Sequence, residues 1–162
     1  MTSISIIGSG KMGSAIANIA ALAGADIQIV NRSARPTKDH PEARYAALGD
    51  DLTGELVVLA VPYGAYPNIL KHYRDRLGGK VVIDIANTID FTTYEQPEAL
   101  VGTSTALELA KQLPEDVVVL KAFNANLAET LITRTNGTTA TTVLFPGDDA
   151  EGKIALAEIL VA

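Results

Sequence analysis

The stretch of sequence that decides the fold is Ile6-Ile7-Gly8-Ser9-Gly10-Lys11-Met12-Gly13, near the start of a chain of 162 residues. Residues 8–13 fit the pattern G-x-G-x-x-G, which small-residue turns also match by chance. The context makes the match specific. Residues 2–7 are mostly β-branched and apolar and predict a buried parallel strand, residues 12–23 predict a helix, and residues 26–30 predict a second strand. The stretch therefore predicts a strand–turn–helix–strand unit.

Each glycine of this turn has a role in holding a pyrophosphate. Gly8 permits the tight turn, Gly10 lets the backbone approach the pyrophosphate, and Gly13 lets the helix pack closely on the strand. The free N–H groups at the helix start, together with the helix dipole, then bind the phosphates. The alternative is a glycine turn that only packing requires. We predict a dinucleotide site that also includes Ser9, Lys11 and Met12, with plain solvation as the alternative for Lys11.

The end of the second predicted strand indicates which dinucleotide is bound. NAD enzymes usually place Asp or Glu there to accept hydrogen bonds from the ribose hydroxyls, but this chain has Asn31-Arg32-Ser33. No carboxylate is present to repel a 2′-phosphate, and the planar guanidinium of Arg32 can clamp one. Arg35 and Lys38 follow and add positive charge. These residues predict NADP(H). The alternative is that Arg32 stacks on adenine and that both cofactors bind.

Strands and helices alternate over the rest of the chain. Strands are predicted over residues 55–61, 80–86, 116–122 and 141–145, and helices over residues 66–77, 104–113, 126–133 and 150–160. This order predicts one α/β domain over residues 1–162, a doubly wound parallel sheet of the NAD(P)-binding Rossmann type. Residues 31–54 contain two prolines and few large apolar side chains. At most a helical turn or a short strand is expected there, over residues 42–48, so the adenine-side edge of the sheet is abbreviated.

Ligands of parallel sheets lie at the carboxyl ends of the strands, which identifies three further segments. These are Ala60-Val61-Pro62-Tyr63, Ala86-Asn87-Thr88 and Ala122-Phe123-Asn124. Tyr63 either lines the nicotinamide or caps the core. Asn87 either hydrogen-bonds the nicotinamide ribose or ends its strand in an Asx turn, and Asn124 carries the same two alternatives. Phe123 is expected in the core.

Composition argues against several kinds of site and partner. The chain has no cysteine, and His40 and His72 lie far apart, so no disulfide, cysteine nucleophile or metal site is expected. A net charge of −6 argues against nucleic acid or an anionic membrane as a partner. The sequence has neither an apolar run of membrane-spanning length nor a secretory signal pattern, so cytoplasmic residence is expected. Asp84, inside an apolar strand, is expected to have a structural role.

Several segments resemble known reductases. Residues 6–17 resemble a broad group that includes the pyrroline-5-carboxylate reductases. Leu59-Ala60-Val61-Pro62-Tyr63, Val82-Ile83-Asp84-Ile85-Ala86-Asn87 and, above all, Val119-Leu120-Lys121-Ala122-Phe123-Asn124 resemble the NADP oxidoreductase family that includes the coenzyme F420-dependent NADP reductases. The resemblance covers nearly the whole chain. It implies a Rossmann fold, NADP(H), and direct hydride transfer between nicotinamide and coenzyme F420, a flavin or another small planar acceptor, with no obligatory catalytic side chain.

The resemblance also has departures. Family members usually continue into a last strand and helices that help to form the dimer and the acceptor pocket, whereas this sequence ends at Leu160-Val161-Ala162. A homodimer is expected from the missing cover. A separate helical domain, on which pyrroline-5-carboxylate and 3-hydroxyacid reductases depend, is absent from the sequence, and these activities are not expected. Two alternatives stay open: a non-catalytic NADP(H) sensor, and an imine or ketone reductase with Tyr63 or a water as proton donor.

Overall fold

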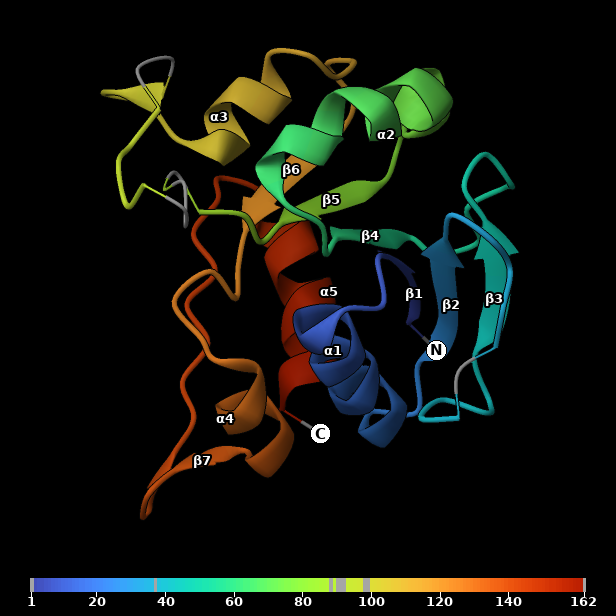
Figure 1. Ribbon diagram of the computed structural model, residues 1–162, viewed down its shortest axis with the longest axis vertical. Coiled ribbons are helices and arrows are strands. Elements are labelled where there is room, and N and C mark those ends of the chain that lie inside the picture. Colours follow the sequence, from blue (N-terminus) through green and yellow to red (C-terminus); the bar gives the residue numbers. More distant parts are fainter. Residues whose placement is uncertain (1, 37, 88, 90–92, 98–99, 162) are drawn as a thin grey trace.

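The computed structural model describes residues 2–36, 38–87, 89, 93–97 and 100–161. Six parallel strands form one sheet in the order β3-β2-β1-β4-β5-β6 (Figure 1). Their bounds are β1 Ser3–Ile7, β2 Asp26–Asn31, β3 Arg44–Ala47, β4 Leu56–Leu59, β5 Val81–Asp84 and β6 Val118–Lys121. This strand order is that of the doubly wound dinucleotide-binding fold. It confirms the predicted fold class.

The strand order reverses beside β1, where the chain crosses from one half of the sheet to the other. β1 pairs with β2 through Ser3 and Asp26, and with β4 through Ile7 and Leu59. In such sheets ligands bind outside the carboxyl ends of the strands, at the point of reversal. The turn after Ile7 lies at this point.

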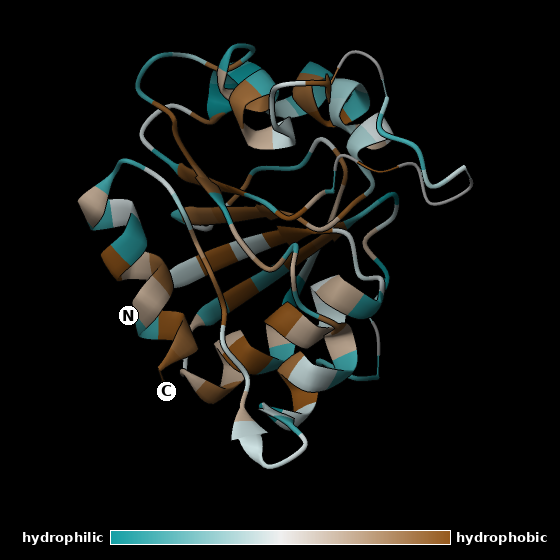
Figure 2. Ribbon diagram, turned by 90° about the vertical axis from the view of Figure 1, so that its left-hand side faces the viewer, coloured by the Kyte–Doolittle hydropathy of each residue, from teal (hydrophilic) through white to brown (hydrophobic). Residues whose placement is uncertain are grey.

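Helices cover both faces of the sheet, as Figures 1 and 2 show. One core joins the sheet to helices α1, α4 and α5, and a second core joins it to α2 and α3. The helices span α1 Lys11–Leu22, α2 Tyr66–Tyr73, α3 Thr105–Ala110, α4 Ala128–Thr133 and α5 Ala150–Leu160, and 3-10 turns occupy η1 Tyr63–Ala65 and η2 Arg74–Arg76. Within β1 the side chains alternate between the cores, because successive residues of a strand point to opposite faces.

Local signals in the sequence explain where several helices begin and end. Gly24, at φ +68°, follows α1 in the left-handed conformation that glycine tolerates. The Ser104 hydroxyl caps α3 by accepting from the Leu107 N–H at 3.2 Å. The Asp149 carboxylate caps α5 by accepting from the Gly152 N–H at 2.6 Å. A glycine after a helix and a serine or aspartate before one are sequence signals of helix ends.

The adenine-side edge of the sheet is abbreviated, as predicted. Between β2 and β3 the described residues contain no helix, and β3 has four residues. Of the two alternatives for residues 42–48, the structure has the short strand. β3 pairs with β2 in register from Gln28–Arg44 to Asn31–Ala47.

The strand predicted over residues 141–145 is wrong. The residues just before it form a small antiparallel hairpin, β7 Thr135–Asn136 and β8 Thr139–Ala140, with Gly137 at φ +63° in its turn. Residues 141–147 alternate between half-buried and exposed, as a strand would, but no ladder forms. At the edge of β6, Pro146 accepts from the Lys121 N–H at 3.1 Å and has no N–H to return. The alternating burial of residues 141–147 therefore reflects packing of one side of this segment and no pairing with another strand.

No helix among the described residues is long and apolar enough to cross a membrane.

Candidate functional site

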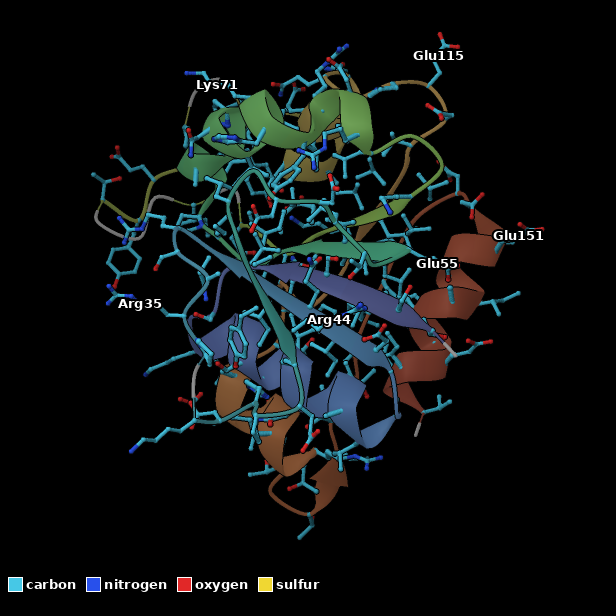
Figure 3. The ribbon with its side chains drawn as sticks, turned by 90° about the vertical axis from the view of Figure 1, so that its right-hand side faces the viewer. Arg35, Arg44, Glu55, Lys71, Glu115 and Glu151 are labelled. Atoms are coloured by element: carbon cyan, nitrogen blue, oxygen red, sulfur yellow. The ribbon has the colours of Figure 1, made fainter. Side chains whose placement is uncertain are left out.

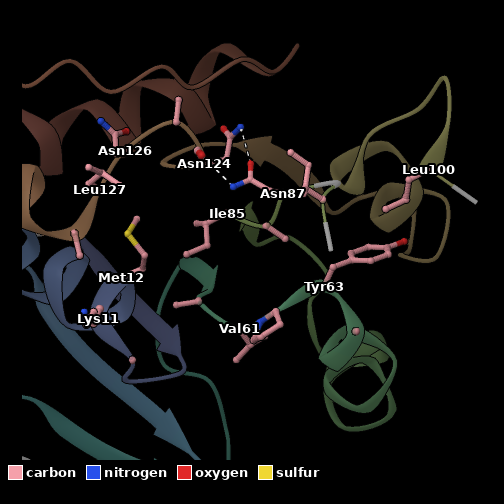
Figure 4. Close-up of a pocket in the computed structure, with 18 of the residues that line it drawn as sticks. Lys11, Met12, Val61, Tyr63, Ile85, Asn87, Leu100, Asn124, Asn126 and Leu127 are labelled. Atoms are coloured by element: carbon pink, nitrogen blue, oxygen red, sulfur yellow. Dashed lines mark hydrogen bonds between the residues drawn. The ribbon is translucent and has the colours of Figure 1, made fainter. Parts of the chain in front are cut away.

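A pocket of about 990 Å³ opens at the carboxyl ends of the strands (Figure 4). It reaches from the start of α1 across the ends of β4 and β5 to the segment that follows β6. Ten of the residues predicted from the sequence line it: Gly10, Lys11, Met12, Ala60, Val61, Pro62, Tyr63, Ala86, Asn87 and Asn124. The structure thus brings together segments that are more than 100 positions apart in the sequence.

The glycine turn forms one end of the pocket, and two of its glycines are required by internal packing. Gly8 has φ +107°, and a Cβ atom there would lie 2.5 Å from the Ala60 carbonyl oxygen. A Cβ atom on Gly13 would lie 2.0 Å from the Gly8 carbonyl oxygen. Both distances are far inside van der Waals contact, so the chain closes this turn only with glycine at both positions.

Gly10 is different, because nothing in the chain explains it. A Cβ atom there would meet no atom within 4 Å, and its φ of −70° suits any residue. Gly10 lines the pocket. The open space beside it is the cradle that the close approach of a pyrophosphate requires. Packing alone therefore does not account for the whole G-x-G-x-x-G pattern.

The start of α1 has the features of a phosphate site. Its N-cap residue, Gly10, offers no side-chain cap, and its first turn contains no acidic residue. The first hydrogen bond within the helix runs from the Ser14 N–H to the Gly10 carbonyl oxygen, at 2.9 Å. The N–H groups before Ser14 are thus available to an anion, and α1 adds its dipole. A dinucleotide pyrophosphate fits these residues.

The residues predicted to select NADP lie outside the pocket, at the end of β2. Arg32, Ser33 and Arg35 are exposed, and Asn31 is half-buried. Arg35 lies at the periphery of the molecule in Figure 3. Within the described part of the chain, the guanidinium groups of Arg32 and Arg35 form no ion pair. Both cations are thus free to meet a phosphate on the adenine side of the turn.

Two asparagines meet at the opposite end of the pocket. The Asn87 amide donates to the Asn124 carbonyl oxygen at 3.2 Å, and the Asn124 amide donates to the Asn87 side-chain oxygen at 3.5 Å (Figure 4). These bonds join the segment after β5 to the segment after β6. Thr88, which the sequence also suggested, lies outside the described residues.

The residues just before Asn124 do not face the pocket. Ala122 is fully buried and packs in the core, so its side chain is placed away from the predicted cofactor position. Phe123 is also buried, which confirms the prediction that it belongs to the core. Its φ is +59°, a conformation rarely seen for a bulky residue. The chain therefore turns sharply between the core at Phe123 and the pocket at Asn124.

Tyr63 lines the pocket and also packs against the core. Its ring meets the ring of Tyr66 edge-on, with centroids 5.2 Å apart. Its packing agrees with the alternative that Tyr63 caps the core, and a contact with nicotinamide stays a prediction. Burial, reinforced by the negative charges of Glu108 and Asp84, raises the pKa of the Tyr63 hydroxyl. The hydroxyl is therefore protonated and neutral around neutral pH.

The structural role predicted for Asp84 is confirmed, but its main partner was not predicted. Asp84 is fully buried and accepts hydrogen bonds from the Tyr66 hydroxyl, the Lys121 ammonium at 2.8 Å and the Ala86 N–H at 2.9 Å. Burial and the adjacent carboxylate hold the pKa of Tyr66 far above its usual range. Asp84 and Lys121 stand opposite each other in the β5–β6 register. That register is the signal that could have paired them.

Sequence reasoning missed half of the pocket lining. The missed residues come from η1, from the segment after β5, from the segment after β6 and from the start of α4: Gly64, Ile85, Ile89, Pro97, Leu100, Ala125, Asn126, Leu127, Ala128 and Glu129. Most belong to irregular segments or helix starts, where neither strand-end position nor hydrophobic period marks a binding residue.

Comparisons with known proteins agree with this geometry. Residues 3–88, more than half of the chain, match the family model of coenzyme F420-dependent NADP oxidoreductases. A search of curated protein sequences found no match.

Solved structures share the fold over the whole chain. A hypothetical protein from Sinorhizobium meliloti is 28% identical with a TM-score of 0.85. The match covers 99% of this chain and 80% of that protein. A candidate F420-dependent NADP reductase from Arthrobacter sp. FB24 is 25% identical with a TM-score of 0.83 and the same coverage. Plasmodium falciparum pyrroline carboxylate reductase, solved with NADP bound, shares the fold at 15% identity and a TM-score of 0.68, over 98% of this chain and 54% of that one.

Sheet order, glycine turn and family match thus agree, and this chain belongs to the coenzyme F420-dependent family of NADP oxidoreductases.

Proposed function

We propose that the protein transfers a hydride between NADP(H) and a planar acceptor of the deazaflavin or flavin type. NADP-dependent oxidoreduction in general follows from the family match and the related structures. The acceptor is the proposed part. The observation that carries it is the character of the pocket beyond the glycine turn.

That part of the pocket has mostly apolar walls, with neutral polar groups at the strand ends and with Asn126 and Glu129 near the start of α4. Val61, Pro62 and Ile85 come from the ends of β4 and β5, and Leu100 and Leu127 line it as well. The polar side chains at the strand ends are the Asn87–Asn124 pair and the protonated hydroxyl of Tyr63. Apolar walls suit two flat rings stacked face to face, the arrangement that direct hydride transfer requires. A bound nicotinamide supplies the hydride chemistry itself.

The chain's own residues would bind and orient. The N–H groups at the start of α1 would hold the pyrophosphate, and Arg32 would hold the 2′-phosphate on the adenine side. Met12 and Val61 would then flank the path from the turn to the nicotinamide end. The amides of Asn87 and Asn124 would hydrogen-bond the nicotinamide half and keep its plane fixed. Apolar side chains around the slot would exclude water from the transfer.

Steady-state oxidation of NADPH, followed at its nicotinamide absorbance, tests this proposal. The acceptors are a deazaflavin, FMN, FAD and riboflavin, with a cyclic imine and a ketone as comparison substrates. Turnover with a deazaflavin or flavin, and slower turnover with the imine and ketone by about a hundredfold or more, is the expected result. Tight NADPH binding without turnover of any acceptor would instead indicate a sensor. Preference for the imine would indicate an imine reductase.

A further inference from the structure

Beneath the pocket lies a buried polar cluster that the proposed binding roles do not use. Its members are Asp84, Lys121, Thr105 and Tyr66. The Asp84 side chain is 0% exposed and that of Lys121 is 15% exposed. The Lys121 ammonium donates to Asp84 at 2.8 Å and to the Thr105 hydroxyl at 2.6 Å, and Thr105 and Tyr66 both donate to Asp84. Such a cluster costs desolvation, so it calls for a reason beyond stability.

The cluster hydrogen-bonds both backbone groups of one residue of the pocket wall, Ala86. The Ala86 N–H donates to the Asp84 carboxylate at 2.9 Å, and the Ala86 carbonyl oxygen accepts from the Lys121 ammonium. Both backbone groups of Ala86 are thus bonded to one buried ion pair. The Asp84 carbonyl oxygen also accepts from the Ala122 N–H at 3.1 Å, which ties the end of β5 to the end of β6.

Ala86 is the last residue before the first of the two pocket asparagines. Asn87 follows Ala86 directly and is joined to Asn124 by their mutual hydrogen bonds. On the other side, Phe123 holds a left-handed φ of +59° just before Asn124. Strain of this kind persists only where the surroundings enforce it, and it gathers at functional sites. The backbone is therefore held on both sides of the Asn87–Asn124 pair. The ion pair holds it at Ala86, and the turn at Phe123 holds it before Asn124.

We propose that Asp84 and Lys121, linked by Thr105, are positioning residues that set the orientation of Asn87 and Asn124 toward the nicotinamide half of the cofactor. Neither charged group lines the pocket. They act through Ala86, on the ring end of the site, and leave the phosphate end at the glycine turn untouched. Their loss should slow hydride transfer while NADPH affinity is largely kept, because the phosphate contacts carry most of the affinity.

The test uses variants that leave no unpaired charge in the interior. Asp84→Asn with Lys121→Met removes both charges together, since the removal of one partner alone is strongly destabilising. Thr105→Val removes only the linking hydroxyl of a buried residue. Leu156→Ala is the control: it removes a fully buried side chain of α5, and Leu156 neither belongs to the cluster nor lines the pocket.

Three measurements are compared, and the first needs no cofactor. Amide hydrogen exchange at Ala86 and Asn87 should rise by about tenfold in both cluster variants and stay unchanged in Leu156→Ala. The NADPH dissociation constant should change by about threefold or less in all variants, while kcat falls by about tenfold in the cluster variants only. A fall in kcat that accompanies faster exchange at Ala86 and Asn87, and that does not follow the loss of overall stability, is the expected result.

The kinetic part of this inference rests on the proposed hydride transfer, and the two can fail separately. If the native chain turns over no acceptor, the proposed function is wrong, and exchange at Ala86 and Asn87 still decides whether the cluster fixes this peptide. Unchanged exchange and unchanged kcat in folded cluster variants would overturn the inference. An equal loss of kcat in Leu156→Ala would overturn it as well, because the effect would then be one of stability.

Discussion

The presence of Gly10 and of Arg32 is not explained by contacts within the described part of the chain. Gly10 stands in open space with an ordinary backbone conformation, and Arg32 is exposed at the end of β2. A bound dinucleotide that extends from Gly10 to Arg32 would explain both residues. In NADP the pyrophosphate needs close access to backbone N–H groups, and the 2′-phosphate needs a planar cation. Cofactor preference should therefore respond to Arg32.

Arg32→Glu should weaken NADPH binding relative to NADH by about tenfold, or ~1.4 kcal/mol. The new carboxylate would repel a 2′-phosphate and accept hydrogen bonds from the ribose hydroxyls of NADH. Fluorescence titrations with both nucleotides measure the preference. Lys71→Glu, the same charge change at an exposed site on α2 (Figure 3), controls for net charge and should leave the preference unchanged. Equal preferences in native chain and Arg32 variant would contradict this role.

Tyr63→Phe separates direct hydride transfer from imine or ketone reduction. Burial raises the pKa of Tyr63 above its ordinary value near 10, so the hydroxyl stays protonated as the pH rises through neutrality. Without a role as proton donor, its removal should change kcat by about threefold or less, and the pH profile should keep its shape between about pH 6 and 9. A loss of about a hundredfold, or of an alkaline limb in the profile, would identify Tyr63 as a general acid.

At the scale of elements, the first strand–turn–helix–strand unit was predictable because local and tertiary requirements agree in it. Gly8 and Gly13 are needed for the turn to close, and Gly24 ends α1 with the positive φ that glycine favours. α5 was predicted with its observed bounds, because its capping Asp149 begins it directly. For residues 42–48 the sequence left two alternatives open, and only pairing with β2 decides between them.

The strand predicted over residues 141–145 is wrong because an alternating pattern indicates which side of a segment is buried. It does not indicate whether the segment pairs with a neighbouring strand.

The candidate site could be predicted only where its residues lie at strand ends. Residues at strand ends could be identified by the rule for parallel sheets, whereas Leu100, Asn126 and Glu129 reach the pocket through tertiary folding alone. The Asp84–Lys121 pair needed the β5–β6 register, which the sequence gives only once both strands are aligned.

Gly13→Ala should cost about 3 kcal/mol of unfolding free energy. The new Cβ atom would lie 2.0 Å from the Gly8 carbonyl oxygen, and neither α1 nor the turn can move aside cheaply. Urea denaturation measures the loss. Gly64→Ala is the matched control, because its Cβ would meet nothing within 4 Å, and it should shift stability by roughly 0.5 kcal/mol or less. Equal midpoints for the two variants would show that the turn is not tightly closed.

At the scale of the whole molecule, the reversal of strand order divides the fold into two halves around one site. Arg32 follows β2 in one half, on the side proposed for the adenine, and the segments that follow β4, β5 and β6 line the pocket in the other half. The glycine turn lies between these halves. We therefore expect that the affinity for the phosphates and the geometry of the ring end can be altered separately.

The homodimer expected from the sequence stays a prediction for the whole molecule. Large apolar side chains, among them Leu127, Leu144 and Ile154, are more than 60% exposed in the single chain. Their burial between two copies would remove apolar surface from water. Sedimentation velocity at micromolar concentration should give twice the chain mass of 17.0 kDa. A single species at the chain mass, over the range of concentrations used for turnover, would contradict the dimer.

The central claim, that a dinucleotide pyrophosphate lies against the glycine turn, is tested most directly by Gly10→Ser. Serine is a better N-cap than glycine, its Cβ has open space, and its hydroxyl would bond the N–H groups at the start of α1. NADPH titration and thermal unfolding are measured together on the native chain and this variant. We expect equal or higher stability with an NADPH affinity lower by about tenfold or more, ~1.4 kcal/mol. Unchanged affinity in the stable variant would contradict the central claim.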